Sequence, residues 1–488
     1  MSSSSPADRQ AQCLEVTQDE TDDLSRSLLD LLTALIAQDY RFFTPTPETH
    51  AKVLQRLASQ TDEARHTVSR SSAKKDDVLR NILLLRASTL EELWGWSLPV
   101  TVDVARSLLV KYLHGGDDQI DTVSSNLLLA PARHGIAQGD SSEIQLRLLL
   151  PQVRVSNLYL PQIRPSPFGV SDDQARKRFY EEVATRRSRV LYAHSAFPTS
   201  DRDSVFFGPD TYRFVRFLHE ALAVLSPPAQ AQQWQLAVDV GTGAGAGAVA
   251  LAGLRGVDGR LGTDAEDVLV RRVIGTDINP KALQYARANA QSYAAAFSED
   301  LKATETTGIA VDLGPGRLDW RLSSLLSGLS KNERAQVDLI VSNPPFIAFG
   351  AKEAGGAPRF EEGSKSALKL GGGATYADGG SLGIALPLLI LRQAIDILRP
   401  GGLLLLYTGV PILMATAGSV SQPQNLLWSA CQELRSLAVI EYWDTIDTDI
   451  FGDEMAPGGT TGSSGYDGTR VGRIEVVGVA LRKAALDS

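Results

Sequence analysis

The strongest constraint on the fold is a repeated pattern in the second half of the chain. Four apolar runs recur there, separated by turns and helical stretches: residues 235–240, 273–277, 339–342 and 403–407. Nearly continuous hydrophobic runs are typical of strands buried on both faces of a parallel sheet. The alternation therefore predicts an α/β, doubly wound, Rossmann-like sheet that binds its ligands at the carboxyl ends of the strands.

The C-terminal part of the chain departs from this alternation. Residues 437–442 and 474–481 are both strand-like, and a Gly- and Ser-rich connection over residues 457–468 joins them. We expect the two runs to form an antiparallel hairpin at the end of the sheet. The connection is either a surface loop or a flap over the site.

The first part of the chain has a different character. Residues 1–23 are rich in Ser, Asp and Glu, which predicts a disordered tail. Helically spaced and then strand-like apolar runs follow, over 24–36, 78–85, 102–112, 127–130 and 144–150. We predict a mainly helical, winged-helix-like domain for substrate recognition over residues 24–200 and a catalytic domain over residues 201–488, a division that the 488-residue length allows.

A glycine-rich turn follows the first predicted strand. The candidate residues in and before this turn are Asp239, Gly241, Thr242, Gly243, Ala244 and Gly245. Glycines permit unusual dihedral angles and close approach of a ligand to the backbone, so a nucleotide-type cofactor fits here. Because Gly243, Gly245 and Ala248 also satisfy a G-x-G-x-x-A pattern, a dinucleotide stays possible at this point.

An acidic residue, Asp277, ends the second predicted strand and is followed by Ile278. A carboxylate in this position can accept hydrogen bonds from both hydroxyls of a ribose. Asp277 lies further from the turn than the roughly 20 residues expected in a dinucleotide fold, although an insertion over residues 255–267 accounts for an excess. The spacing leaves an NAD-dependent oxidoreductase possible, and the next motif decides against it.

The third strand runs directly into the most specific motif of the chain, Asn343, Pro344, Pro345 and Phe346. Because prolines fix φ and lack N–H groups, their carbonyls can face a cleft while the Asn343 side-chain oxygen accepts a substrate N–H. A planar amide, amidine or aromatic amine is a poor nucleophile, and such bonds orient its lone pair for in-line attack. Phe346 would stack on the flat group. The alternative interpretation is a Pro-Pro turn that caps a strand beside a core phenylalanine.

At these residues the chain resembles class I S-adenosylmethionine-dependent methyltransferases, in particular the release-factor glutamine methyltransferase type and its small-domain relatives. The resemblance covers roughly residues 205–481. It implies that residues 241–245 line the methionine and ribose of the cofactor, that Asp277 with Ile278 binds the ribose, and that Asn343 with Pro344 holds the target nitrogen. It also implies that Asp239 orients the turn and the cofactor's amino group.

Other segments agree with the resemblance or depart from it. Residues 207–211 correspond to a segment beside the cofactor, and they equally fit an N-cap turn before a helix. Where the family has an acid for the adenine amino group, this chain has Ser324 and Leu325 after Ser323. The Gly-rich residues 378–383 precede a helix, as in the family. The chain looks like a little-characterised two-domain branch, for which the resemblance supplies no substrate.

Composition limits the partners and the location. The net charge of −9 argues against a broad basic surface for nucleic acid, and the best local patch, residues 176–189, has acidic residues interleaved with its arginines. The two cysteines, Cys13 and Cys431, support no disulfide framework. The chain shows no membrane span or targeting segment, so we expect a cytoplasmic protein. Its six histidines lack metal-ligand spacing, so no metal is implied.

The sequence thus predicts an N-methyltransferase that uses S-adenosylmethionine and acts on a planar or amide nitrogen. The foremost acceptor is a glutamine-type side chain of a protein. An amino group of an rRNA or tRNA base and a small metabolite are the alternatives within this class. In a different class stands a non-catalytic binding protein on a methyltransferase fold, in which the N-terminal domain does the work.

Overall fold

The computed structural model describes residues 18–60, 85–113, 116–129, 148–161, 187–199, 201–225, 227, 233–254, 269–303, 317–348, 375–414, 423–450, 466 and 471–485. Residues 78–84 of the expected helix over residues 78–85 lie outside this part of the chain, and so does nearly all of the connection over residues 457–468. The chain divides into two compact units, Met1–Tyr40 with Leu54–Arg154 and Arg41–Val53 with Val155–Ser488. Each unit is described by itself below.

The first unit is mainly helical, as expected for the N-terminal region. Its helices are α2 (Gln18–Ala37), the end of α3 (Pro47–Ala58), α5 (Leu90–Trp94), α6 (Val102–Tyr112) and α7 (Asp117–Leu127). Helix α2 begins within the segment predicted to be a tail. Three short antiparallel strands, β1 (Val100–Thr101), β2 (Leu128–Leu129) and β3 (Leu148–Pro151), form a sheet in the order β1-β3-β2. Its winged-helix character stays a prediction.

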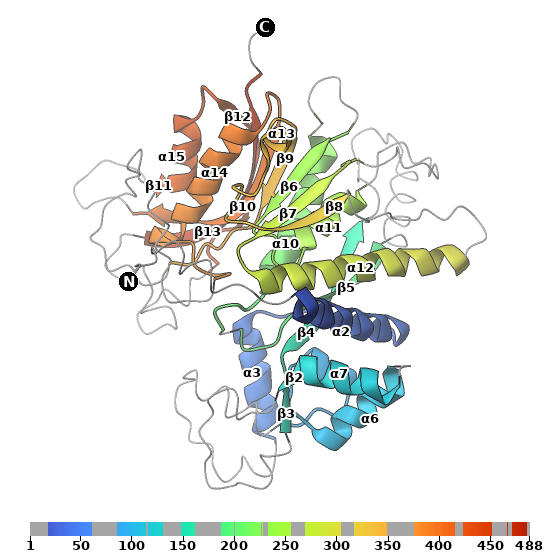
Figure 1. Ribbon diagram of the computed structural model, residues 1–488. Coiled ribbons are helices and arrows are strands. Elements are labelled where there is room, and N and C mark those ends of the chain that lie inside the picture. The colour runs from blue at the N-terminus through green and yellow to red at the C-terminus, as the bar shows by residue number, and fades with distance from the viewer. Residues whose placement is uncertain are drawn as a thin grey trace, which may run out of the picture. The chain divides into compact units, whose positions relative to one another are not determined.

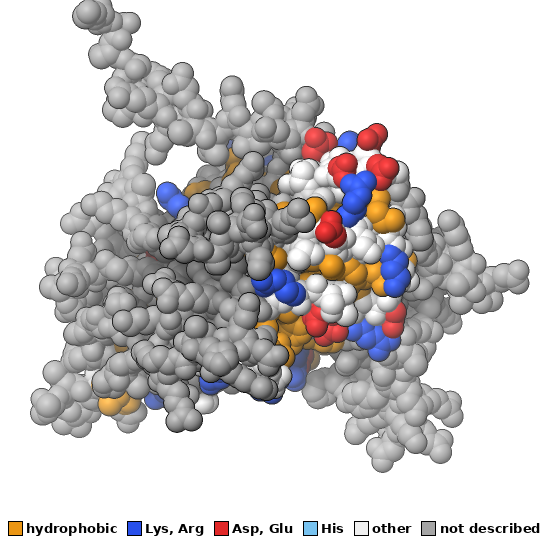
Figure 2. Space-filling view, turned by 90° about the horizontal axis from the view of Figure 1, so that it is seen from below, with side chains coloured by type: hydrophobic (Ala, Val, Ile, Leu, Met, Phe, Trp, Pro, Cys, Tyr) orange, Lys and Arg blue, Asp and Glu red, His pale blue; other side chains and the backbone are white. Residues whose placement is uncertain are grey.

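Charges of both signs share the described surface of the helical unit. Arg106 of α6 pairs with Asp117 and Asp121 of α7. Figure 2 shows basic and acidic side chains interspersed around hydrophobic ones over the described part of the face that it presents. The described part of that face (Figure 2) therefore shows no concentrated positive patch of the kind that binds a phosphate backbone.

The second unit contains a sheet of eight strands (Figure 1). Along the sheet the order is β12 (Ala438–Asp447), β13 (Val471–Lys483), β10 (Leu403–Leu413), β9 (Val337–Ser342), β6 (Leu236–Val240), β7 (Val273–Asp277) and β8 (Leu318–Leu322), and β11 (Gln424–Asn425) pairs with β10. The strands from β10 to β8 are parallel, whereas β13 runs antiparallel to β10 and to β12. The predicted sheet and its C-terminal antiparallel hairpin are confirmed.

Helices cover both faces of the sheet. Apolar residues of α14 (Ala385–Ile397) and α15 (Leu426–Glu433) share one hydrophobic cluster with alternate residues of the strands, including Val477 and Val479. Gly478 lies between these two valines, and a Cβ there would collide with Phe217 of α10 (Pro209–Val224). Because successive strand residues face opposite sides, α10 packs on the other face.

The remaining helices of the second unit follow the strands in sequence: α11 (Ala246–Gly253), α12 (Pro280–Ala303), α13 (Lys331–Arg334) and the 3₁₀ turn η4 (Ser381–Gly383). A separate two-stranded sheet of β4 (Val153–Pro161) and β5 (Arg187–Ser195) also packs here. The buried Asn289 of α12 holds β5, because its side chain exchanges hydrogen bonds with the backbone of Ala193 and donates to Ala244 O. No helix among the described residues is long and apolar enough to cross a membrane.

Candidate functional site

The register of three adjacent strands brings the predicted site residues together. Val240 of β6 pairs with Thr276 of β7 on one side and with Ser342 of β9 on the other. The residues that follow these three, Gly241, Asp277 and Asn343, therefore leave the sheet at the same level and at the same edge. Carboxyl ends of neighbouring parallel strands are where α/β sheets bind their ligands.

The glycine turn has one open side and one packed side. Gly241, Gly243 and Gly245 have φ values of +69°, +55° and +86°, a region that only glycine occupies routinely. A Cβ on Gly241 or Gly243 would meet nothing within 4 Å. A Cβ on Gly245 would lie 3.0 Å from both Ala286 and Trp320. The first two glycines thus leave space above the turn, whereas Gly245 permits close packing beneath it.

Asp239 organises this turn from inside. Its carboxylate is 2% exposed and accepts hydrogen bonds from the Thr242 hydroxyl (2.6 Å) and the Ala248 N–H (2.8 Å). Burial raises the pKa of Asp239 to about 6, although the two hydrogen bonds act to lower it. The nearby charge of Asp277 raises this pKa further. Thr242 and Ala244 are buried as well.

Asp277 joins the turn to the second strand. One carboxylate oxygen accepts from the Gly243 N–H (2.9 Å) and the other from the Asn279 N–H (2.8 Å). Burial raises the pKa of Asp277, and its backbone hydrogen bonds act in the opposite direction. Each oxygen keeps a further lone pair for a hydroxyl group. The neighbouring Ile278 is 55% exposed and offers an apolar surface beside the carboxylate.

The loop after β8 carries the candidate adenine contacts. Ser323 is buried, and its hydroxyl accepts from the Gly328 N–H and donates to Leu325 O. Ser324 is exposed, and Leu325 has a left-handed φ of +52°. A non-glycine residue in this region stores strain of about 1–3 kcal/mol and is typical of functional sites.

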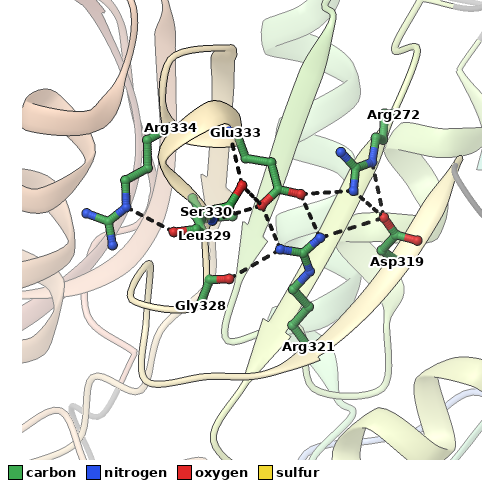
Figure 3. A network of polar contacts seen from close by, with 8 residues as sticks. All are labelled: Arg272, Asp319, Arg321, Gly328, Leu329, Ser330, Glu333 and Arg334. Atoms are coloured by element: carbon green, nitrogen blue, oxygen red, sulfur yellow. Dashed lines mark hydrogen bonds and ion pairs between the residues drawn. The ribbon is translucent and has the colours of Figure 1, made fainter.

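An ion network holds this loop against the sheet (Figure 3). Glu333 of α13 accepts from Arg321 of β8 at 2.6 and 2.7 Å and from Arg272 at 3.0 Å. It also caps its own helix through the Ser330 N–H and hydroxyl. The hydrogen bonds from Arg321 hold the pKa of Glu333 well below its ordinary value. Sequence reasoning missed this network, since its members lie on separate elements.

The Asn-Pro-Pro-Phe motif starts at the end of β9. Asn343 and Pro345 are half-buried, and Pro344 is buried. Phe346 is only 7% exposed, and its ring lies directly against Gly409 of β10, where a Cβ would collide with it. The ring therefore braces the motif on the sheet, and its expected stacking on an acceptor stays a prediction.

The Gly-rich segment after the motif clasps its backbone. Ile347 N–H donates to Ala377 O (3.0 Å), and Gly379 N–H donates to Ile347 O (2.8 Å). A Cβ on Gly379 would collide with the backbone of Pro345 and Phe346. The Tyr466 hydroxyl donates to Phe346 O (3.3 Å) from the far side. These contacts hold the backbone of Phe346 and Ile347, at the end of the motif, in one orientation.

The start of α10 lies beside both parts of the site. Gly208 caps the helix, and its N–H donates to the Thr211 hydroxyl. Asp210 accepts from the Tyr407 hydroxyl at 3.1 Å, and burial raises the pKa of Asp210. Phe214, one turn later, lies where a Cβ on Gly247 would be. The segment is an N-cap turn, and its helix packs against the helix that follows the glycine turn.

Metal ligation has no support in the described part of the chain, where no three His, Cys, Asp or Glu side chains gather. His219 of α10 is buried, and desolvation lowers its pKa to about 3. This neutral, buried ring belongs to the core. The side chains of the arginine-rich segment, residues 176–189, lie outside the described residues.

Comparisons with known proteins yield structural neighbours and no family. No protein-family model and no curated protein matches the chain. Similar solved structures include Trm5b from Pyrococcus abyssi (13% identity, 61% of this chain and 60% of that chain, TM-score 0.28). They also include a ribosomal protein L11 methylase from Lactobacillus delbrueckii subsp. bulgaricus (14% identity, 56% of this chain and 80% of that chain, TM-score 0.27). A third is a T. thermophilus 16S rRNA N2 methyltransferase in complex with AdoMet and guanosine (12% identity, 79% of this chain and 64% of that chain, TM-score 0.29). The chain spans less than two thirds of the length of Trm5b and of the 16S rRNA methyltransferase.

The assignment of the fold rests on the sheet itself. From one edge to the other the strands run β8-β7-β6-β9-β10-β13-β12, with β13 inserted antiparallel beside β10. The chain thus enters the sheet at β6 in the middle, continues through β7 to β8 at one edge, and crosses back to β9 and β10. It ends in the antiparallel hairpin of β12 and β13 at the other edge. This mixed sheet is typical of the class I methyltransferase fold.

Proposed function

We propose that this chain is an S-adenosylmethionine-dependent N-methyltransferase that acts on a planar or amide nitrogen, foremost a glutamine-type side chain of a protein. The observation that carries the proposal is the convergence of three strand ends: an open glycine turn, an acid and the Asn343 motif leave neighbouring strands at one level. Each supplies one of the functions that methyl transfer to nitrogen needs.

The cofactor would lie over the open side of the glycine turn. Asp277 would accept its ribose hydroxyls, with Ile278 beside the ring, and the backbone of residues 241–245 would follow the methionine part. Asp239 would hold the turn in shape, since its carboxylate already bonds to Thr242 and Ala248. Ser324 and the backbone of Leu325 would border the adenine. When bound, S-adenosylmethionine supplies an electrophilic methyl group.

The acceptor would lie over the Asn-Pro-Pro-Phe motif. The Asn343 side-chain oxygen and the Pro344 carbonyl would accept the N–H groups of a planar nitrogen and thereby aim its lone pair at the methyl group. Residues 377–379 support this role, because they hold the residue directly after the motif, through hydrogen bonds to the N–H and the carbonyl of Ile347. Pre-oriented acceptors need no reorganisation during the reaction.

The net charge of the chain favours a protein acceptor over nucleic acid. The whole chain carries a net charge of −9. A phosphate backbone would be repelled by a protein of this charge unless a local basic segment compensates. A neutral amide has no such penalty.

Two measurements on matched variants test the proposal. Calorimetric titration with S-adenosylmethionine should show binding for the wild type and for Asn343→Ala, and much weaker binding for Asp277→Ala. Transfer of tritiated methyl groups to an extract that lacks the native protein should be lost in both variants. Asn425→Ala is the control, because Asn425 only caps α15 through the Trp428 N–H; it should behave as wild type.

The chemical nature of the labelled product identifies the acceptor. Label that protease removes supports the protein amide, and label that nuclease removes would replace it by a nucleic-acid base. Label in small molecules only would point to a metabolite. A folded wild-type protein that does not bind S-adenosylmethionine would overturn the proposed function as a whole.

A further inference from the structure

A short segment crosses the site between the cofactor strand end and the motif. We call residues 201–207, which lie between β5 and α10, the strap. Its C-terminal end is tied to β5, because Val205 N–H donates to the Ser195 hydroxyl (2.8 Å) and Ser195 N–H donates to Val205 O (2.9 Å). Its last residue, Phe207, begins the segment 207–211, which by the family resemblance corresponds to a segment beside the cofactor.

The middle of the strap is bound to the cofactor side. The Asn279 side chain donates to Asp203 O at 2.8 Å, and Lys281 Nζ lies 3.2 Å from the Asp203 carboxylate. The Asn279 N–H donates in turn to Asp277. One residue therefore contacts both the strap and the acid that would hold the ribose.

Another part of the strap is bound to the acceptor side. The Thr375 N–H and hydroxyl both donate to Arg202 O, at 3.1 and 2.9 Å. The Tyr376 ring stacks on Phe206 with a centroid distance of 5.0 Å and an interplanar angle of 7°. The Tyr376 hydroxyl donates to Thr199 O just before the strap. Tyr376 directly precedes Ala377, whose carbonyl holds Ile347 after the motif.

The strap thus connects two strand ends that do not touch in the sheet. Strand β6 separates β7, which carries Asp277, from β9, which carries Asn343. In-line transfer requires that the methyl group and the acceptor nitrogen keep one relative position, and a displacement of about 1 Å lowers the rate about 10²-fold. A direct connection across the edge of the sheet limits such displacement.

We propose that Tyr376 is a positioning residue that, through the strap, fixes the acceptor motif relative to the cofactor strand end. This inference rests on the proposed function. The ring of Tyr376 is the main connection, since it combines the stack on Phe206 with hydrogen bonds of its hydroxyl to Thr199. It would act on the rate of transfer and leave the cofactor contacts of the glycine turn unchanged.

The test compares cofactor affinity with transfer rate in the full-length protein. Tyr376→Ala should lower the maximal rate of tritiated methyl transfer to extract about 10- to 100-fold, while the S-adenosylmethionine Kd from calorimetry stays within about twofold of the wild type. Tyr376→Phe keeps the ring stack and should recover most of the rate. Tyr442→Ala is the control, because it removes a similar ring contact, with Phe217, on the other edge of the sheet.

Each outcome separates this inference from the proposed function. A wild type that neither binds nor transfers the methyl donor overturns both. If Tyr376→Ala transfers at the same maximal rate as an active wild type, the positioning role alone is overturned. It is also overturned if Tyr442→Ala loses as much of the maximal rate as Tyr376→Ala does. If Tyr376→Ala does not fold, Thr375→Val replaces it: this near-isosteric change removes one bond to Arg202 O and should lower the rate several-fold at unchanged Kd.

Discussion

The two sides of the glycine turn should respond in opposite ways to the same substitution. We expect Gly243→Ala to weaken S-adenosylmethionine binding with a modest loss of stability, and Gly245→Ala to reduce stability much more. At both positions alanine must adopt a positive φ, which costs about 1–2 kcal/mol. The difference between them comes from what the added methyl group meets.

At Gly243 the methyl group would enter the open space above the turn, where no protein atom lies within 4 Å. The methyl group therefore lowers the binding free energy of the cofactor rather than the stability of the protein. A methyl group forced into a filled site costs about 1–3 kcal/mol, equivalent to a loss of affinity of roughly 5- to 150-fold. At Gly245 the methyl group would lie 3.0 Å from Ala286 and Trp320. Both penalties then fall on the folded protein, for a total of about 2–5 kcal/mol.

Calorimetric titration with S-adenosylmethionine measures the first effect, and guanidinium unfolding measures the second. The Asp277 hydrogen bond survives in Gly243→Ala, because it uses the backbone N–H, so lost affinity reports the methyl group itself. If Gly243→Ala binds the cofactor as the wild type does, the cofactor does not lie on the open side of the turn. The reasoning would also fail if both variants lost the same stability.

Three further predictions concern single side chains. Asn343→Ala should reduce methyl transfer about 10²- to 10³-fold, by analogy with the loss of one oriented hydrogen-bond partner, with cofactor affinity unchanged in calorimetry. Asp239→Asn should flatten the pH dependence of stability. The pKa of Asp239 is raised to about 6 in the folded protein, which therefore retains a proton that the unfolded chain releases near pH 4. The free energy of unfolding of the wild type should fall by about 1.4 kcal/mol per pH unit as the pH rises from about 4 to about 6. Glu333→Gln should lower the free energy of unfolding at pH 7 by about 1–3 kcal/mol, because it weakens the charged bonds to Arg321 and Arg272 (Figure 3). Since the pKa of Glu333 is lowered, its stabilisation should be present above about pH 4.5 and be lost as the pH falls.

Urea unfolding across about pH 2–7 checks both acids in one series, because stability should fall with rising pH through Asp239 and with falling pH below about pH 4.5 through Glu333. A steeper slope in Asp239→Asn than in the wild type would contradict the buried, proton-retaining carboxylate. Equal acid sensitivity of Glu333→Gln and wild type would show that the network contributes nothing as an ion pair. For Asn343, a parallel fall in cofactor affinity and transfer would mean that the motif serves the cofactor rather than the acceptor.

Local sequence patterns were sufficient to predict most of the eight-stranded sheet. Strand β7 has the expected bounds, Val273–Asp277, and β6 lies within the predicted run. Such strands are apolar throughout because helices cover both of their faces. Strand β10 continues beyond its predicted end to Leu413, and strand β13 begins before its predicted start, at Val471. Their outer parts pair mainly with each other in a hairpin that apolar runs do not delimit.

The candidate site shows the same division. The positive φ values of the turn agree with its glycines, which adopt such values at little cost. The positions of Asp277 and Asn343 at one edge of the sheet follow from their order along the chain, because parallel strands place their carboxyl ends together. The burial of Phe346 against Gly409, by contrast, depends on a contact between residues 63 positions apart. No local pattern distinguishes a ring that faces a ligand from a ring that faces a neighbouring strand.

The sequence by itself determined the order of strands and helices along the chain, the glycine turn and the position of the Asn-Pro-Pro-Phe motif at a strand end, since each depends on neighbouring residues and on backbone geometry. Tertiary structure alone decided which glycines face open space, which carboxylates gain raised pKa values, and how Tyr376 and Asn279 connect two strand ends through the strap. These properties arise from burial and from contacts between distant segments, which only the folded chain brings within a few ångströms of each other.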